Sequence, residues 1–185
     1  MEQNERSIYR RGADNGLLLG LYFCIMFAFV IIGERMEAVG IISTLMMFGV
    51  PFLVYRFLRK TFVEQRGLTM FSALWTQGII AFAGAGLVLA VAVYVYIRFL
   101  DPDIVLRQVD KLIDIYSDAD TPRADEMLTV LKNMRDLHLY PSAREIIIQL
   151  ELLSIFSGSI LSMLMSLLVR MKGYDRNSRQ THQNF

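Results

Sequence analysis

The 185-residue chain has little of what catalysis, metal binding and covalent cross-linking require, since it holds one cysteine and two histidines. Cys24 has no second cysteine to pair with, so an intramolecular disulfide is excluded. Catalysis by acid, base or nucleophile needs titratable groups held together in one cleft. His138 and His182 each lack a second base nearby in the sequence. We therefore expect no enzymatic activity and no cofactor, and the sequence assigns no catalytic, cofactor-binding or metal-ligating residues.

Charge is missing from four long stretches, which together make the chain 54% hydrophobic with a mean hydropathy of +0.40. A bilayer core about 30 Å thick is crossed by about 20 apolar helical residues, because a helix satisfies its own backbone hydrogen bonds. We predict four transmembrane helices, at about residues 15–33, 38–55, 73–97 and 150–170. Ala38-Val39-Gly40 loosely resembles a signal-peptidase site. However, the apolar run before it is longer than a usual signal core, and another span follows at once.

The charges that are present separate by segment. The N-terminal tail, the linker at 56–66 and the C-terminal tail hold 11 of the 19 basic residues but five of the 18 acidic ones, a net charge of +6. The remaining charged segments, at 34–37 and 98–151, carry a net charge of −5. By the positive-inside rule, both termini and the linker are cytoplasmic, and the connection between the third and fourth spans lies on the opposite side.

That connection, residues 101–141, carries start signals for two helices. Asp101-Pro102 and Thr121-Pro122 each supply an N-cap residue followed by proline at the first helical position. Apolar residues then recur at helical spacing at Val105, Val109, Leu112, Ile113 and Tyr116, and again at Met127, Leu128, Leu131 and Met134. Because the link at 117–120 is short, we predict an antiparallel helical hairpin. Ser142-Ala-Arg-Glu145 forms a capping box, so the last helix begins before its span.

Two short motifs frame the third span. It opens with Gly67-Leu-Thr-Met-Phe-Ser-Ala and leaves through Tyr94-x-Tyr-Ile-x-Phe-Leu-Asp-Pro-Asp103. With the two closely linked first spans, the basic linker and the serine-rich last span, the chain resembles domain-of-unknown-function family 4199, small uncharacterised inner-membrane proteins of Bacteroidota. The resemblance covers nearly the whole chain. It implies a bacterial inner membrane with the hairpin in the periplasm, and it brings no catalytic residues, because the family has none assigned.

Binding sites are weakly supported by the sequence. Asp118-Ala-Asp120-Thr-Pro122 begins like a calcium loop, but Arg123 stands where glycine is required and Thr129 replaces the closing glutamate. Ion-coupled carriers place ionisable groups within the bilayer, and the four uncharged stretches contain none. Gln77 and the fourth-span serines are only weakly polar. A pore formed by several copies, lined by Ser154, Ser157, Ser162 and Ser166, stays an open alternative.

Small residues at four-residue spacing are the stronger signal. Gly16-x-x-x-Gly20 in the first span and Ser154-x-x-x-Gly158-x-x-x-Ser162-x-x-x-Ser166 in the fourth each place small residues on one helix face. Such faces let helix backbones approach closely in a membrane. We predict a compact four-helix bundle. The sequence leaves open whether these stripes pack within one chain or between chains.

These patterns predict an all-α membrane protein with four transmembrane helices and a periplasmic helical hairpin between spans 3 and 4. We expect a single membrane domain over residues 1–185, ending in a disordered cytoplasmic tail at 173–185, in the bacterial inner membrane with both termini cytoplasmic. The favoured function is a non-enzymatic accessory or scaffold protein whose hairpin contacts an envelope protein partner or the lipid surface. The lipid bilayer and a homo-oligomer are further expected partners, and nucleic acid is not. The alternative is a small transporter or channel component.

The charge distribution predicts sidedness in a directly measurable way. In a Cys24→Ser background, Lys132→Cys should react with a membrane-impermeant maleimide added to intact spheroplasts, because it lies in the acidic connection. Lys60→Cys, in the basic linker, should react only after the membrane is permeabilised. Both are read as a gel shift of the labelled protein. Labelling of Lys60→Cys in intact spheroplasts would overturn the orientation.

Overall fold

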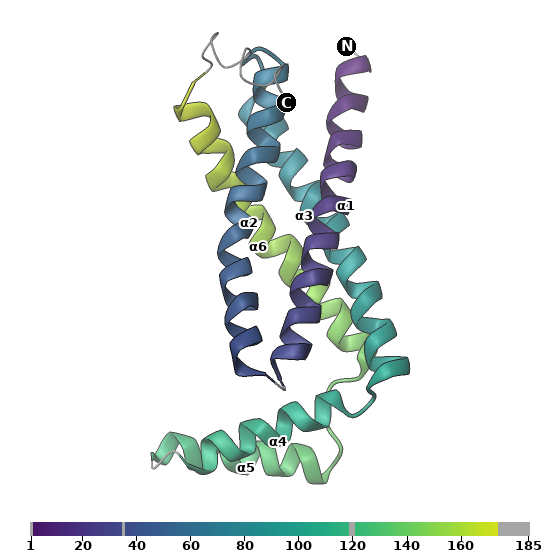
Figure 1. Cartoon of the computed structure of the whole chain (residues 1–185), viewed down its shortest axis with the longest axis vertical. Helices are drawn as coiled ribbons and strands as arrows, with labels where there is room; N and C mark the ends of the chain where they lie inside the picture. The colour runs from purple at the N-terminus through teal and green to yellow at the C-terminus, as the bar shows by residue number, and fades with distance from the viewer. Residues whose placement is uncertain (1, 35, 119–120, 174–185) are drawn as a thin grey trace. The chain divides into compact units, whose positions relative to one another are not determined.

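A computed structural model describes residues 2–34, 36–118 and 121–173, and the described residues form helices joined by short turns (Figure 1). The elements in chain order are α1 (Glu2–Gly33), α2 (Glu37–Glu64), α3 (Phe71–Val95), the π-helical turn η1 (Tyr96–Leu100), α4 (Ile104–Ser117), α5 (Pro122–Asp136) and α6 (Ala143–Met171). Four segments are long and apolar enough to cross a membrane: Ile8–Gly33, Val39–Glu64, Phe71–Leu100 and Ala143–Met171. The all-α class and the four candidate spans are therefore confirmed. The predicted tail at 173–185 lies, beyond Gly173, outside the described residues.

Two helices extend past their predicted spans into the neighbouring charged segments. α1 begins at Glu2 and not near residue 15, and α2 continues through the basic linker to Glu64. Arginine, lysine and glutamate are good helix formers and are solvated outside the hydrocarbon. A change from apolar to charged residues therefore marks the edge of a span, and not the end of its helix.

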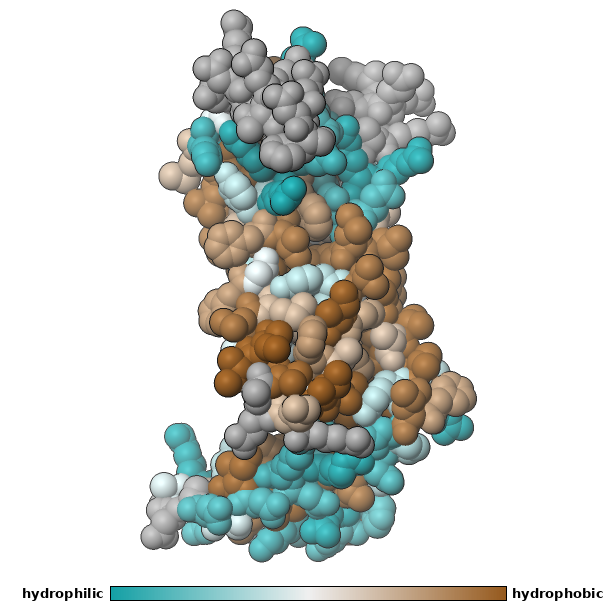
Figure 2. Space-filling model, in the orientation of Figure 1, coloured by the Kyte–Doolittle hydropathy of each residue, from teal (hydrophilic) through white to brown (hydrophobic). Residues whose placement is uncertain are grey.

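The chain divides into two compact units. The first, called the bundle here, comprises residues up to Leu89 together with Leu150 onward, and the second comprises Ala90–Gln149. In the bundle, the first turn of α1 and the last turn of α6 lie at the same end (Figure 1). Its surface carries a broad apolar band, as a membrane-spanning bundle requires (Figure 2).

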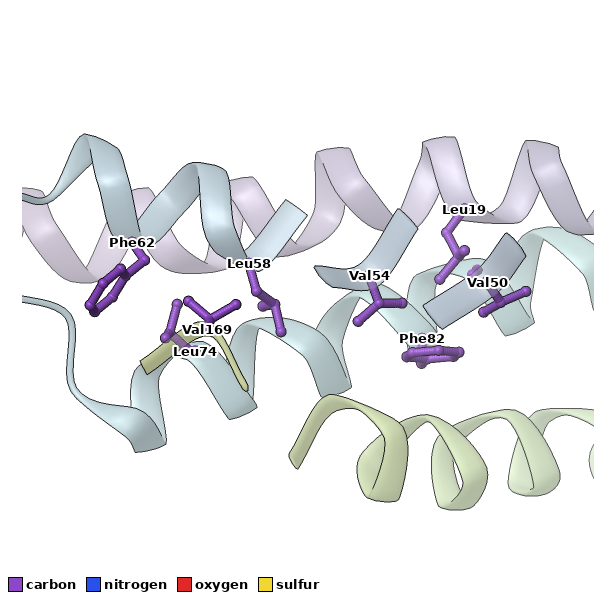
Figure 3. Packing of buried hydrophobic residues seen from close by; sticks show 9 residues of the cluster. Leu19, Val50, Val54, Leu58, Phe62, Leu74, Phe82 and Val169 are labelled. Carbon is purple, nitrogen blue, oxygen red and sulfur yellow. The ribbon is translucent and has the colours of Figure 1, made fainter. Parts of the chain in front are cut away.

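The interior of the bundle is built mainly from one face of α2 (Figure 3). The buried cluster contains Leu19 of α1, Val50, Val54, Leu58 and Phe62 of α2, Leu74, Phe82 and Ala85 of α3, and Val169 of α6. The α2 members recur every four residues, which places them along one side of the helix. All four long helices therefore share one core, and the predicted four-helix bundle is confirmed.

α1 and α2 form an antiparallel pair that is held at three levels. Near the turn, Gly33 and Gly40 are so close that a β-carbon on Gly33 would lie 2.8 Å from the Gly40 Cα atom. At mid-height, the Tyr22 hydroxyl donates to the Met46 carbonyl oxygen at 2.6 Å. At the far end, the Arg11 guanidinium pairs with the Glu64 carboxylate. The two helices are therefore held together along their whole shared length.

Asp101 does not cap α4, contrary to the sequence prediction. The helix begins at Ile104, and its N-cap residue Asp103 makes no side-chain capping bond. Asp101 instead accepts hydrogen bonds from both terminal nitrogens of Arg107, one of them at 2.8 Å, and from the Tyr96 hydroxyl at 3.2 Å. The hydrogen bonds from Arg107 lower the pKa of Asp101. A two-point contact with a charged guanidinium is stronger than a single bond from a backbone N–H, so the carboxylate pairs with the arginine.

The second unit contains the predicted hairpin. Val109 and Ile113 of α4 and Leu131 of α5 form its buried cluster, with Tyr116 and Leu128 packed against them. Thr121 caps α5 as predicted, because its hydroxyl oxygen accepts from the Ala124 amide at 3.3 Å. The Arg135 Nε atom lies 3.3 Å from Asp110 Oδ1, which ties the two helices together at their surface. The prediction of a helical hairpin between spans 3 and 4 is confirmed.

Candidate functional site

α3 and α6 run antiparallel through the bundle and touch at points four residues apart. A β-carbon added to Gly78 would overlap the Ser162 side chain, and one added to Gly158 would overlap the Phe82 ring. A β-carbon on Gly86 would overlap the Glu151 carboxylate and would lie 3.0 Å from Ser154. We call this line of contacts the α3–α6 seam. It shows that the small-residue stripe of the fourth span packs within one chain.

The serines of α6 have different surroundings and do not form one polar lining. Ser162 and Ser166 are fully buried, and the Ser166 hydroxyl donates to the Ser162 carbonyl at 2.7 Å. Ser154 instead donates across the seam to the Phe82 carbonyl at 3.1 Å. Ser157 is exposed on another face and donates to Leu153 of its own helix. The four serines considered as a pore lining therefore do not share one face.

A second seam joins α3 to α1, and here the helices run parallel. A β-carbon on Gly16 would lie 2.9 Å from the Ala81 carbonyl oxygen, and one on Gly20 would lie 2.7 Å from Val88. Gly12 makes the same kind of approach to Ile80, at 2.9 Å. The predicted role of Gly16 and Gly20 in close helix packing is confirmed, and Gly12 extends the series by one turn. α3 is thus packed closely on two sides.

Polar groups with unused hydrogen-bonding capacity lie within this packing. The Gln77 side chain is 1% exposed, and its amide donates to the Thr61 hydroxyl of α2 at 3.0 Å. Within the described residues, neither the Gln77 Oε1 atom nor the fully buried Ser162 Oγ atom has a hydrogen-bond partner. Gln77 immediately precedes Gly78, against which Ser162 packs. Buried polar groups are normally paired, so this part of the seam has unused binding capacity.

Glu151 is the functional candidate that the sequence analysis missed. The charge sorting counts it with the segment at 98–151, outside the uncharged stretches, although the predicted span at 150–170 contains it. The structure places it in the ninth position of α6, where its Oε2 atom is buried against Gly86 and has no hydrogen-bond partner among the described residues. The sequence carried a signal for this position. Ile146-Ile-Ile148 precedes Glu151 and Leu152-Leu153 follows it, so Gln149 and Glu151 are the polar residues in an otherwise apolar run.

Phe82 separates these two polar positions along the seam. Its side chain is buried in the core cluster (Figure 3). The ring packs against Gly158, and its centroid lies 6.2 Å from that of Phe23 on α1. Gly86 with Glu151 lies one helical turn to one side of Phe82 on α3, and Gly78 with Ser162 lies one turn to the other. The seam therefore holds the Glu151 carboxyl group on one side of an aromatic ring and the Ser162 hydroxyl on the other.

The remaining candidates from the sequence, His138 and the calcium-like segment, do not form a site in the described part of the chain. His138 lies just past the end of α5 with φ 53°, and the two backbone bonds around it, His138 N–H to Arg135 and Leu139 N–H to Met134, form a helix-terminating motif. The calcium-like segment runs into residues 119–120, outside the described residues. Across the described part of the chain, no group of three His, Cys, Asp or Glu residues is arranged to hold a metal ion.

Comparison with known proteins gives one match. A family model described as "Protein of unknown function (DUF4199)" matches residues 14–171, which include all four candidate spans apart from the first turns of α1. No curated protein and no solved structure matches the chain. The resemblance drawn from the two motifs around the third span is therefore confirmed.

The seam predicts unequal effects for two substitutions in α6. Gly158→Leu should clearly lower the thermal stability of the purified protein in detergent, because leucine must displace the Phe82 ring. Overpacking of this kind costs about 1–3 kcal/mol. Leu164→Ala is the matched control, since Leu164 is 50% exposed and lipid or detergent can fill the lost volume. A Gly158→Leu protein as stable as wild type would contradict the packing role of the seam.

Proposed function

The chain belongs to the DUF4199 family of proteins of unknown function, and we propose that it is a non-enzymatic scaffold of the bacterial inner membrane. In this proposal both termini are cytoplasmic and the α4–α5 hairpin lies in the periplasm, where it contacts another envelope protein. The charge difference between the segments on either side of the spans supports this orientation.

One observation carries the proposal: the hairpin has a second apolar face in addition to its buried one. On α5, Met127, Val130 and Leu137 are 45%, 58% and 67% exposed, and with Met134 they recur at helical spacing. On α4, Leu112 and Ile115 are also exposed, at 42% and 63%. The sequence places Leu112, Met127 and Met134 in the same apolar stripes as Ile113 and Leu131, but the buried cluster contains Ile113 and Leu131 without them.

The second apolar face is informative because the first face alone packs the two helices of the hairpin together. Val109, Ile113 and Leu131 are buried between the two helices, so the outer residues are not needed to pair α4 with α5. Contiguous exposed apolar residues on a small unit mark interaction surfaces, whereas scattered single ones do not. The acidic residues that flank the outer face favour a partner with basic groups around an apolar patch.

A small transporter or channel component is the second candidate, and one observation favours it. Ionisable residues inside membrane spans are rare and usually lie on ion or proton pathways. Glu151 is such a residue, since its carboxylate lies against Gly86 of α3 within the bundle. This supports a transport role more strongly than the serines do.

Site-specific photocross-linking tests the scaffold proposal in the full-length protein in native membranes. A photoreactive amino acid at Val130 should form a cross-link to a second protein, because this position lies on the exposed apolar face. The matched control is Lys132, two positions along α5 and on the opposite side of the helix. Cross-linked products are identified by mass spectrometry.

The polar substitution Ile115→Gln should remove the Val130 cross-link, since Ile115 belongs to the same face. If Val130 cross-links only to phospholipid, the exposed face contacts the lipid surface and not a protein. Equal cross-linking from Val130 and Lys132 would contradict a specific contact face.

A further inference from the structure

We propose that Glu151 is a proton-binding site inside the bundle, with a carboxyl group that takes up and releases a proton between Gly86 and Ser154. This inference goes beyond the scaffold function and does not rest on it. It follows from three features of the site: its position along the helices, the absence of an opposing charge, and a neighbouring acceptor that suits a neutral acid.

The position of Glu151 is fixed by its contact with Gly86. α3 runs from Phe71 to Val95, so Gly86 lies about 22 Å from its start and about 13 Å from its end at 1.5 Å per residue. On the other side of α3, Ala85 packs against Gly20, in the uncharged part of α1. A hydrocarbon core is about 30 Å thick. The carboxyl group therefore contacts α3 at a depth where the surroundings are hydrocarbon and protein.

None of the helices brings a cation to this depth. The sequence has no charged residue between Asp14 and Glu34 on α1, between Glu37 and Arg56 on α2, or between Arg66 and Arg98 around α3. On α6 itself, the neighbouring charges are Arg144 and Glu145 near its start and Arg170 near its end. The charged groups of this sequence thus offer Glu151 no counter-charge within the spans.

Two other titratable groups of the bundle interior, on α1, have contacts of their own. The Tyr22 hydroxyl donates to the Met46 carbonyl of α2. The Cys24 sulfur lies 4.0 Å from the Val88 carbonyl oxygen. Burying an ionised carboxylate without a partner is very costly, whereas a neutral carboxylic acid is tolerated.

The immediate surroundings of Glu151 suit the neutral acid. The Oε2 atom is buried and has no hydrogen-bond partner within the described residues. Ser154 lies against the same point of Gly86, one helical turn along α6. Its hydroxyl already donates to the Phe82 carbonyl at 3.1 Å, so the serine oxygen has lone pairs left to accept a hydrogen bond. A rotation of the side chain would let a protonated Glu151 donate to this oxygen, whereas an ionised Glu151 has no proton to donate.

Access to Glu151 from the membrane is provided by its partial exposure. The residue as a whole is half-buried, although Oε2 is covered. Leu152 and Leu153, next along the helix, are both 63% exposed. A hydrophobic reagent dissolved in the membrane can therefore reach the carboxyl group, which makes the proposal testable by chemical modification.

Dicyclohexylcarbodiimide is the reagent for this test. The carboxylic acid transfers its proton to a carbodiimide nitrogen, and the carboxylate oxygen then adds to the central carbon. The resulting O-acylisourea rearranges to a stable N-acylurea, so the whole reagent is added and no atom is lost. Because the reaction starts from the protonated acid in an apolar medium, it reports the neutral form of a membrane carboxyl group.

The full-length protein in liposomes should be modified at Glu151, detected by mass spectrometry of the peptide that contains it. Modification should decrease with rising pH, by about tenfold per pH unit once the acid ionises. Glu151→Gln should abolish this modification while keeping the wild-type Tm, because the amide imitates the neutral acid in shape and charge. Asp103 and Glu126 are exposed carboxylates in the same chain and serve as internal controls.

Two results would overturn the proposal. One is a recovered Glu151 peptide without modification at any pH tested. The other is modification of Glu151 that is no greater than that of Asp103 and Glu126. Gly86→Ala provides a second check, since the added methyl group overlaps the carboxylate and should reduce the modification even if the protein stays folded. Unchanged labelling of Gly86→Ala would show that Glu151 does not occupy the site described.

Discussion

The close approach of α3 to its neighbours is the constraint on which the bundle depends. Lipid chains are as apolar as leucine, so burial of apolar surface does not drive helices together in a membrane, and close packing must do so. Glycines on α3 and α6 provide that packing: Gly78 accommodates Ser162, Gly158 accommodates the Phe82 ring, and Gly86 accommodates the Glu151 carboxylate. A larger residue at any of these positions would separate the helices.

Polar side chains also lie in or beside the seam, next to the residues that pack α3 closely. Ser154 and Ser166 use their hydroxyl groups in backbone hydrogen bonds, as serines in membrane helices usually do. Gln77 joins α3 to α2 through Thr61, and its side-chain oxygen has no hydrogen-bond partner in the described part of the chain. Glu151 is the one position on the seam where a proton can be gained or lost. The α3–α6 seam is therefore a candidate functional site because it contains the carboxyl group of Glu151.

Local signals in the sequence were reliable where the interaction they predict is local. Thr121 caps α5, and Ser142 forms its capping box, with the Ser142 amide 2.7 Å from the Glu145 carboxylate. The prediction for Asp101 failed because Arg107, one turn into α4, competes for the same carboxylate. Glu151 was missed because ionisable groups were sought only within the uncharged stretches, the last of which begins at Leu152, although the predicted span at 150–170 contains Glu151. The contact between Phe82 and Gly158 depends on which helix faces meet, and spacing alone does not specify that.

The central claim is that the α3–α6 seam packs within one chain, and a disulfide across the seam tests it most directly. Gly86→Cys and Ser154→Cys, combined in a Cys24→Ser background, place two β-carbons 3.0 Å apart, so that a small outward shift of the helices gives disulfide geometry. Oxidation in native membranes should give an intrachain disulfide, detected as a cross-linked peptide pair from a protein that migrates as a monomer. A disulfide-linked dimer, with no intrachain product, would contradict the account and assign the seam to contact between chains.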